Sequence, residues 1–161
     1  MLGRLKLSSI ASTEPASPPG VTRTFSYTYD VAAGTYTRTG PDAVETFVEL
    51  DAADRVQFVR RGPAASPLMT ATYTYYPNDL VESITYGNLA SIHYTYDEAN
   101  RVTVIEHRND ALGTILLRMD YAYYSNDLPA QFIEGDYLSG AWTIRGQTDF
   151  WYDRRNCSGS A

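Results

Sequence analysis

One short unit recurs six times along the chain, and this repetition restricts the fold more than any other feature of the sequence. Each copy places aromatic or β-branched residues directly before a polar turn. The copies begin at Tyr27, Val48, Tyr73, Tyr94, Tyr121 and Phe150, and their turns begin 21 to 29 residues apart. A unit that returns at such intervals is the signature of a repeat architecture. The sequence therefore predicts a tandem array of β-hairpins.

The fourth position of each turn is restricted to glycine, asparagine and aspartate. These are the residues that best tolerate a left-handed backbone, and a type I turn closed by one of them commonly joins antiparallel strands. We therefore expect the chain to reverse at each of these positions, which are Gly34, Asp54, Asp79, Asn100, Asp127 and Asn156.

The first position of each turn divides the copies into two classes. Four copies begin with aspartate, whose carboxylate can accept a hydrogen bond from a backbone N–H two residues later; they are Asp30, Asp51, Asp97 and Asp153. The other two begin with Tyr76 and Tyr124 within a shared pattern, YxYYxNDL. The array therefore has a period of two hairpins superimposed on the period of one.

The segments beside the turns show the period-two pattern of strands, as in Ile92, Tyr94 and Tyr96. At the hairpin ends opposite these turns, the strands are joined by segments of loop composition (residues 62–67, 109–113 and 136–140). No amphipathic helix is evident. The predicted fold class is all-β: an antiparallel meander of about 11 or 12 strands, forming a curved sheet or partial barrel that dimerisation could close.

The two ends of the chain differ in composition from the repeats. Residues 1–22 are predicted to be a disordered or extended arm, residues 23–156 a single β domain, and residues 157–161 a tail that reads as a cloning remnant. The length of the chain is enough to allow one sizeable core. The sequence contains neither a secretory h-region nor an apolar span of membrane length, so the chain as given is expected to be soluble. These features leave its localisation undetermined.

The pattern YxYDxxGR followed by an apolar residue is matched best by Tyr94, Tyr96, Asp97, Asn100, Arg101 and Val102. In this respect the stretch from Phe25 to Asn156 resembles the YD repeats of RHS proteins, of the shell subunits of bacterial toxin complexes and of teneurins. The resemblance implies hairpins that wind into a hollow shell around another polypeptide, in proteins that bacteria secrete or display. This chain departs from the pattern where Thr35, Leu80 and Leu128 replace the arginine, and it has too few units to build a shell.

A short array has unpaired sheet edges, and something must cover their free N–H and C=O groups. A closed barrel, a sandwich and an isologous dimer each satisfy that need, and we favour a homodimer, with the rest of a larger RHS shell as the other partner. Nucleic acid is not expected as a partner because the net charge is −6 and the pI is about 4.8.

Few residues suggest chemistry. Most of the 14 tyrosines are expected to pack across strands. The candidate catalytic residues are His93, Glu106, His107, Tyr94 and Tyr96. The two histidines are predicted to lie on opposite faces of the sheet, which argues against a shared metal. Cys157 is the only cysteine, and no cofactor motif is present, so neither a metal nor a cofactor is expected.

These features favour a structural, non-enzymatic fragment of a larger shell-forming or surface protein. A small hydrolase that acts on activated esters or phosphoesters in a tyrosine-rich pocket is the first alternative. A module that binds carbohydrate or a cell surface is the second.

Overall fold

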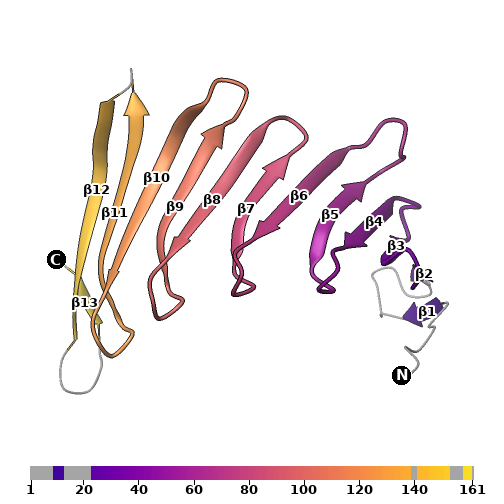
Figure 1. The fold of residues 1–161 in the computed structure, drawn as a ribbon, viewed down its shortest axis with the longest axis horizontal. Coiled ribbons are helices and arrows are strands. Elements are labelled where there is room, and N and C mark those ends of the chain that lie inside the picture. The colour runs from indigo at the N-terminus through magenta and orange to yellow at the C-terminus, as the bar shows by residue number, and fades with distance from the viewer. Residues whose placement is uncertain (1–8, 13–22, 139–140, 153–157, 161) are drawn as a thin grey trace. The chain divides into compact units, whose positions relative to one another are not determined.

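The computed structural model describes residues 9–12, 23–138, 141–152 and 158–160. In these residues the chain forms 13 strands and no helix (Figure 1). The chain divides into two compact units, residues 1–73 and 74–161. We describe each unit separately.

The first unit contains the strands from β1 to most of β6. Their bounds are Ser9–Ser12 (β1), Arg23–Asp30 (β2), Thr35–Thr39 (β3), Glu45–Leu50 (β4), Val56–Arg61 (β5) and Met69–Tyr75 (β6). Each strand pairs in antiparallel fashion with the one that follows it. The unit is therefore a simple meander.

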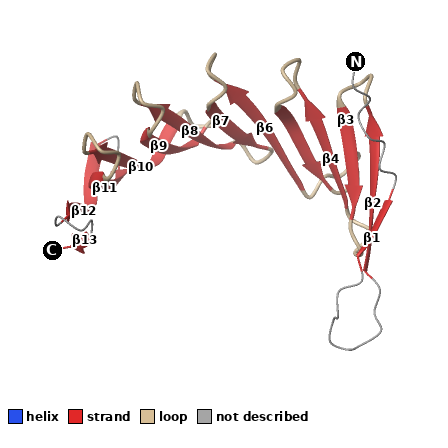
Figure 2. Cartoon of the chain, turned by 90° about the horizontal axis from the view of Figure 1, so that it is seen from below, coloured by secondary structure: helices blue, strands red, loops and turns tan. Residues whose placement is uncertain are grey.

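The second unit begins within β6, at Thr74, and continues the same pattern. Its further strands are Val81–Tyr86 (β7), Ala90–Tyr96 (β8), Val102–Asn109 (β9), Thr114–Tyr123 (β10), Pro129–Leu138 (β11), Ala141–Tyr152 (β12) and Ser158–Ser160 (β13). From β7 onward, consecutive strands again pair antiparallel. The predicted fold class, an all-β antiparallel meander of tandem hairpins, is confirmed (Figure 2).

Left-handed corners lie at one end of these hairpins. The φ angles are 66° at Gly34, 63° at Asp54, 66° at Asp79, 63° at Asn100 and 67° at Asp127. These are the positions at which the sequence restricts the residue type, and the physical reason is that a side chain with a Cβ is strained in this region unless it is short and polar. Asn156 and Asp153 lie outside the described residues.

At the opposite hairpin ends the residue types are less regular. Ala43 (φ 57°) and Leu89 (φ 64°) adopt the left-handed conformation without glycine, asparagine or aspartate to signal it. One predicted loop is wrong in part, because residues 136–138 belong to β11 and Leu138 pairs directly with Ala141. Strand pairing with β12 overrides the polar composition of that segment.

The length of the chain allows a sizeable core, but the described side chains do not form one. Among them, Val48 and Ala71 are the only buried hydrophobic residues, at 5% and 2% exposure. Within each unit, contacts between elements join only strands that are consecutive in the chain. The described residues of each unit thus form a single sheet layer with no second described layer packed against it, and large hydrophobic residues remain exposed on it.

The short strands β1 and β13 lie in the end segments that the sequence analysis placed outside the β domain. The backbone of β1 pairs with β2 from Ser9 opposite Ser26 to Ser12 opposite Arg23, and β13 pairs with the last residues of β12. Cys157 lies outside the described residues.

Candidate functional site

The turn that follows β8 shows how the YD motif folds. Asp97 accepts hydrogen bonds from the backbone N–H groups of Ala99 (2.9 Å) and Arg101 (3.0 Å) through Oδ1. Its other oxygen, Oδ2, accepts two bonds of 2.7 Å from Nε and Nη2 of Arg101. The aspartate thus fixes both the turn backbone and the arginine side chain, which explains why the motif pairs these two residue types.

The turn from Asp51 to Arg55 repeats this geometry. Asp51 Oδ1 accepts from the N–H groups of Ala53 (2.8 Å) and Arg55 (3.0 Å), and Arg55 Nε donates to Oδ2 at 2.7 Å. The side-chain hydrogen bonds from the arginines hold the pKa of Asp51 and of Asp97 below the ordinary value for aspartate. Both carboxylates are therefore committed to the turns.

Two tyrosines at the ends of strands join their hairpin to the preceding one. Tyr96 donates its hydroxyl proton to the carbonyl oxygen of Val81 at 2.9 Å, and Tyr123 donates to the carbonyl oxygen of Val102 at 2.7 Å. In both cases the acceptor is the first strand residue after the preceding turn. Burial is the main reason that the pKa of both phenols is raised. We call these contacts the backward latches.

In the two YxYY turns, a second tyrosine hydroxyl donates a hydrogen bond to the hairpin that follows in the chain. Tyr76 donates to the carbonyl oxygen of Tyr94 at 3.0 Å, and Tyr124 donates to that of Phe150 at 2.8 Å. The rings of Tyr76 and Tyr96 meet edge to face with centroids 6.0 Å apart. The tyrosine that replaces aspartate in these copies therefore forms a forward latch to the next hairpin, which explains the two-hairpin period.

Arg101 supplies the forward contact of the intervening YD turn. Besides Asp97, its guanidinium donates to the carbonyl oxygen of Tyr124 at 3.1 Å and to Asp127 at 2.7 Å. It also lies 4.8 Å from the centroid of the Tyr123 ring, within the range of a cation–π contact. The polar groups of the motif thus join successive hairpins along the turn edge of the second unit.

The five candidate catalytic residues do not come together. His93 pairs with Glu106 across β8 and β9, whereas His107 pairs with Ile92, so the two histidines lie on opposite faces of the sheet. This holds although the hairpin contains a bulge between Thr95 and Tyr96. Tyr94 and Tyr96 alternate with His93 along β8 and therefore lie on the face of His107.

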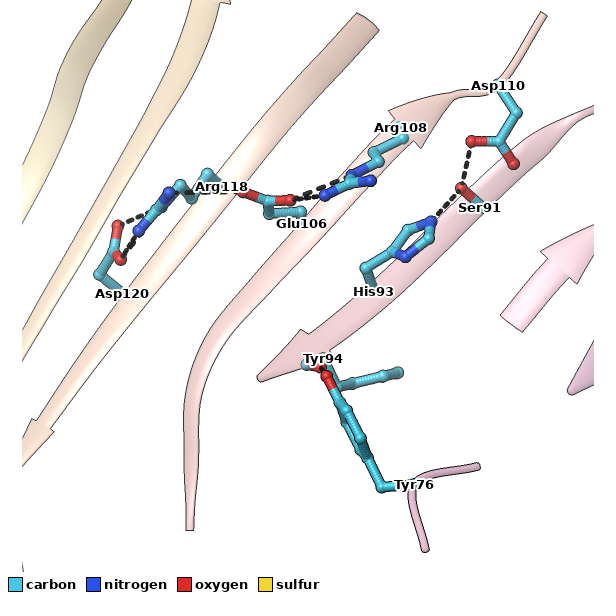
Figure 3. A network of polar contacts seen from close by, with 9 residues as sticks. All are labelled: Tyr76, Ser91, His93, Tyr94, Glu106, Arg108, Asp110, Arg118 and Asp120. Atoms are coloured by element: carbon cyan, nitrogen blue, oxygen red, sulfur yellow. Dashed lines mark hydrogen bonds and ion pairs between the residues drawn. The ribbon is translucent and has the colours of Figure 1, made fainter. Parts of the chain in front are cut away.

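On the face of His93, a row of charged side chains crosses β9 and β10 (Figure 3). Glu106 is only 9% exposed and is held by Arg108 and, at 3.4 Å, by Nη1 of Arg118. Arg118 in turn donates to Asp120 at 2.7 to 3.0 Å, and this bond is the main cause of its raised pKa. With two arginines on its oxygens, Glu106 is positioned as a structural anion rather than as a general base.

His93 belongs to a second polar chain, also drawn in Figure 3. Ser91, which is 2% exposed, donates its hydroxyl proton to Oδ1 of Asp110 at 2.8 Å, and its oxygen lies 3.1 Å from Nε2 of His93. The single hydroxyl proton of Ser91 therefore goes to the carboxylate of Asp110 and not to Nε2 of the histidine. This is not the arrangement that activates a serine nucleophile.

Neither chain was predicted from the sequence, in which Glu106 and His93 were candidates but the residues that contact them were not. A signal was available: Glu106 and Arg108, and likewise Arg118 and Asp120, alternate within one strand with opposite charges, the spacing that places both on one face. What brings the two pairs together is the register of β9 and β10, with Arg118 opposite Glu106.

Among the described residues, no group of three or more histidine, cysteine, aspartate or glutamate side chains is arranged to hold a metal ion. The same part of the chain contains no helix that could span a membrane.

No protein-family profile matches the chain, and no curated protein matches it either. Solved structures do. The crystal structures of TcdB2-TccC3-TEV and TcdB2-TccC3-Cdc42 superpose with TM-scores of 0.71 and 0.72, at 15% and 16% identity, over 85% and 86% of this chain. The Photorhabdus luminescens Tc holotoxin pore, with a mutation in TccC3, gives a TM-score of 0.71 at 16% identity over 85% of this chain.

The matched region spans 7% of the length of each of those toxin-complex chains. At this level of identity the likeness concerns the fold. It confirms the resemblance that the tyrosine and aspartate repeats suggested: in fold, the chain resembles a short run of the YD-repeat hairpins of toxin-complex shell proteins.

Proposed function

We propose that this chain is a structural YD-repeat module of a larger shell-forming or surface protein of RHS type, and that it has no catalytic role. One observation carries the proposal. In the second unit, the aspartate and arginine of the YD turn are bonded to each other, and the hydroxyls of four turn-flanking tyrosines form latches between successive hairpins. Such groups hold an array together, and a ligand would have to displace these bonds.

The hydrolase alternative receives less support from the geometry. The buried carboxylate of Glu106 is neutralised by arginines, and the hydroxyl of Ser91 donates its proton to Asp110 rather than to His93. His107 lies on the other face. A hydrolytic site needs a nucleophile, a base and an open position within hydrogen-bond reach of one another, and these residues do not provide that arrangement.

The thinness of each unit supports membership of a larger assembly. A single-layer sheet with exposed side chains such as Ile144 (54%) and Trp151 (54%) gains stability when a further surface covers it. The structures that the chain resembles are parts of far longer polypeptides. In our proposal, further hairpins of an RHS-type shell provide this cover.

For the isolated chain we propose a homodimer as the substitute for that cover. Residues 141–149 of β12 pair with β11 along one edge, and the only other described neighbour of this strand, β13, reaches residues 150–152. Light scattering after gel filtration tests this: we expect twice the chain mass of 18.0 kDa, and a monomer at micromolar concentration would contradict it.

The structural role is tested by substituting a latch residue and a candidate catalytic residue and comparing their effects on stability and on hydrolysis. Tyr96→Phe is expected to lower the urea midpoint of unfolding, because it removes the hydrogen bond to Val81. The chain is expected to hydrolyse neither p-nitrophenyl acetate nor p-nitrophenyl phosphate above the buffer rate. Turnover that is present in the unaltered chain and lost in a folded His93→Ala variant would overturn the proposal and restore the hydrolase.

A further inference from the structure

The first unit contains a pocket that plays no part in the latches. Its volume is about 450 Å³, and it lies beside the turn that joins β3 to β4, with Phe25, Arg38, Asp42, Val44, Thr46 and Arg61 in its lining. A volume of this size is within the range of small-molecule sites.

Strand register explains why two arginines share this pocket. Arg38 on β3 pairs with Thr46 on β4, and Thr46 pairs with Arg61 on β5. Directly paired residues point to the same face, so the three side chains form a cross-strand row, which we call the arginine row. Because adjacent strands lie about 4.8 Å apart, the arginine Cα atoms are about 10 Å apart. Two side chains of that length can converge on one anion above the threonine hydroxyl.

The charges of the arginine row are incompletely matched. Among the described residues no carboxylate pairs with Arg38, whose guanidinium instead lies 4.7 Å from the centroid of the Phe25 ring. Arg61 has one loose partner, Asp42, at 3.6 Å, and both of these side chains are 54% exposed. In a chain with net charge −6, this pocket therefore gathers two guanidinium groups against one carboxylate.

A purely structural role for Arg38 is the competing explanation, and the molecule contains an example of it. Arg60, next to Arg61 but on the opposite face of β5, lies 4.8 Å from the centroid of the Phe47 ring. That arginine caps an aromatic ring without lining this pocket. Arg38 differs because it caps a ring and also lines a pocket that a second arginine, Arg61, lines as well.

We propose that the arginine row binds a small organic carboxylate. The carboxylate accepts bidentate hydrogen bonds from Arg38 and further bonds from Thr46 and Arg61, because the planar guanidinium matches the spacing of carboxylate oxygens. The apolar body of the ligand lies against Pro41 and Val44, which line the same pocket. This binding site is independent of the structural role proposed above.

Benzoate is a suitable probe, because it joins one carboxylate to an apolar ring, and benzamide is its neutral counterpart. In titrations of ¹⁵N-labelled full-length chain followed by amide chemical shifts, we expect saturable shifts with benzoate at the amides of residues 38–46. We expect no saturation with benzamide. Inorganic phosphate is expected to bind at least several-fold more weakly, because it offers nothing to the apolar part of the pocket.

Three variants separate ligand binding from folding. Arg38→Gln is expected to weaken benzoate binding about 10-fold, the loss typical of one charged hydrogen-bond pair. Asp42→Asn is expected to strengthen it a few-fold, because it removes the carboxylate that, among the described residues, competes for Arg61. Arg60→Gln, the matched ring-capping control, is expected to leave the affinity unchanged.

Several results would overturn the proposal. They are benzoate shifts that do not saturate by about 50 mM, equal binding of benzamide or of phosphate, and equal losses in the Arg38→Gln and Arg60→Gln variants. If Arg38→Gln fails to fold, the benzoate affinity of Asp42→Asn tests the proposal instead. Weaker benzoate binding in that variant would contradict competition between Asp42 and the ligand for Arg61.

Discussion

The hydroxyl of Tyr123 donates a 2.7 Å hydrogen bond to the carbonyl oxygen of Val102, the first strand residue after the preceding turn. Tyr96 makes the same bond to Val81 one hairpin earlier. A residue of the YD motif thus stabilises two hairpins at once. In a sheet layer with few buried hydrophobic side chains, such bonds carry a larger share of the stability than they would beside a thick core.

Tyr123→Phe is predicted to lower the free energy of unfolding by about 1 kcal/mol, because it deletes one hydrogen bond while keeping the ring. Tyr121→Phe is the matched control: Tyr121 lies in the same strand, and its hydroxyl has only a 3.9 Å contact with Met119 Sδ. Urea denaturation measures both changes. Equal effects of the two substitutions would contradict a specific role for the latch.

Asn100→Val is predicted to destabilise the β8–β9 hairpin by about 1–2 kcal/mol, because a β-branched residue is strained at a φ of 63°. Asn100→Gly keeps the backbone conformation and loses only the 2.9 Å bond from Asn78, so its effect should be smaller. Hydrogen exchange of the amides of β8 and β9 reports the difference. Glu98→Val, in the same turn but without positive φ, is the control and should change protection little.

These corners were predictable because the constraint is local: the φ angle at one residue limits which side chains fit there. The left-handed Leu89 and Ala43 show the limit of that inference, since the chain tolerates the strain where no favourable residue is present. The pairing of Arg118 with Glu106 depends instead on which residues of β9 and β10 face each other. Alternating charges within each strand indicate a shared face, but the register between strands is set by turns and bulges.

The thin core has a similar explanation. Composition and length indicate how much surface a chain could bury, but they do not indicate whether its strands fold back into a second layer. Val48 and Ala71 are buried in a row with Val59, to which both are paired across adjacent strands. The repeat predicted the meander, but nothing in its period indicated that the described side chains would remain in one layer.

Stability in acid should depend on the bond between Asp97 and Arg101. The hydrogen bonds from Arg101 lower the folded-state pKa of Asp97 below its ordinary value of 3.8. Because the folded-state pKa is the lower one, this carboxylate stabilises the fold above pH 4 or so, and its contribution is lost as the pH falls through the folded value.

Arg101→Gln should therefore be less stable than the unaltered chain at pH 7, and the difference should shrink as the pH falls below about 4. Urea midpoints between pH 2.5 and 7 measure this convergence. For Arg38→Gln, which removes an arginine with no carboxylate partner among the described residues, we expect no such convergence. A difference for Arg101→Gln that stays constant with pH would show that its contacts with Tyr124 and Tyr123 dominate.

Gly135→Ala tests how closely β11 and β12 approach. A Cβ at residue 135 would lie 2.5 Å from the carbonyl oxygen of Thr143 and 2.7 Å from the Trp142 ring. The carbonyl belongs to the backbone of the paired strand and cannot move without disturbing the register, so we predict a loss of about 1–3 kcal/mol in the free energy of unfolding.

Gly146 provides the matched control, because it lies in the facing strand, opposite Glu134, and a Cβ there would meet no atom within 4 Å. Gly146→Ala is expected to be neutral or to stabilise the fold by up to about 1 kcal/mol, since it restricts the unfolded chain. Thermal or urea unfolding distinguishes the two. If Gly135→Ala proved as stable as Gly146→Ala, Trp142 would not pack closely over the β11 backbone in solution. The register of β11 and β12 at the bulge beside Gly135 would then depend on other contacts.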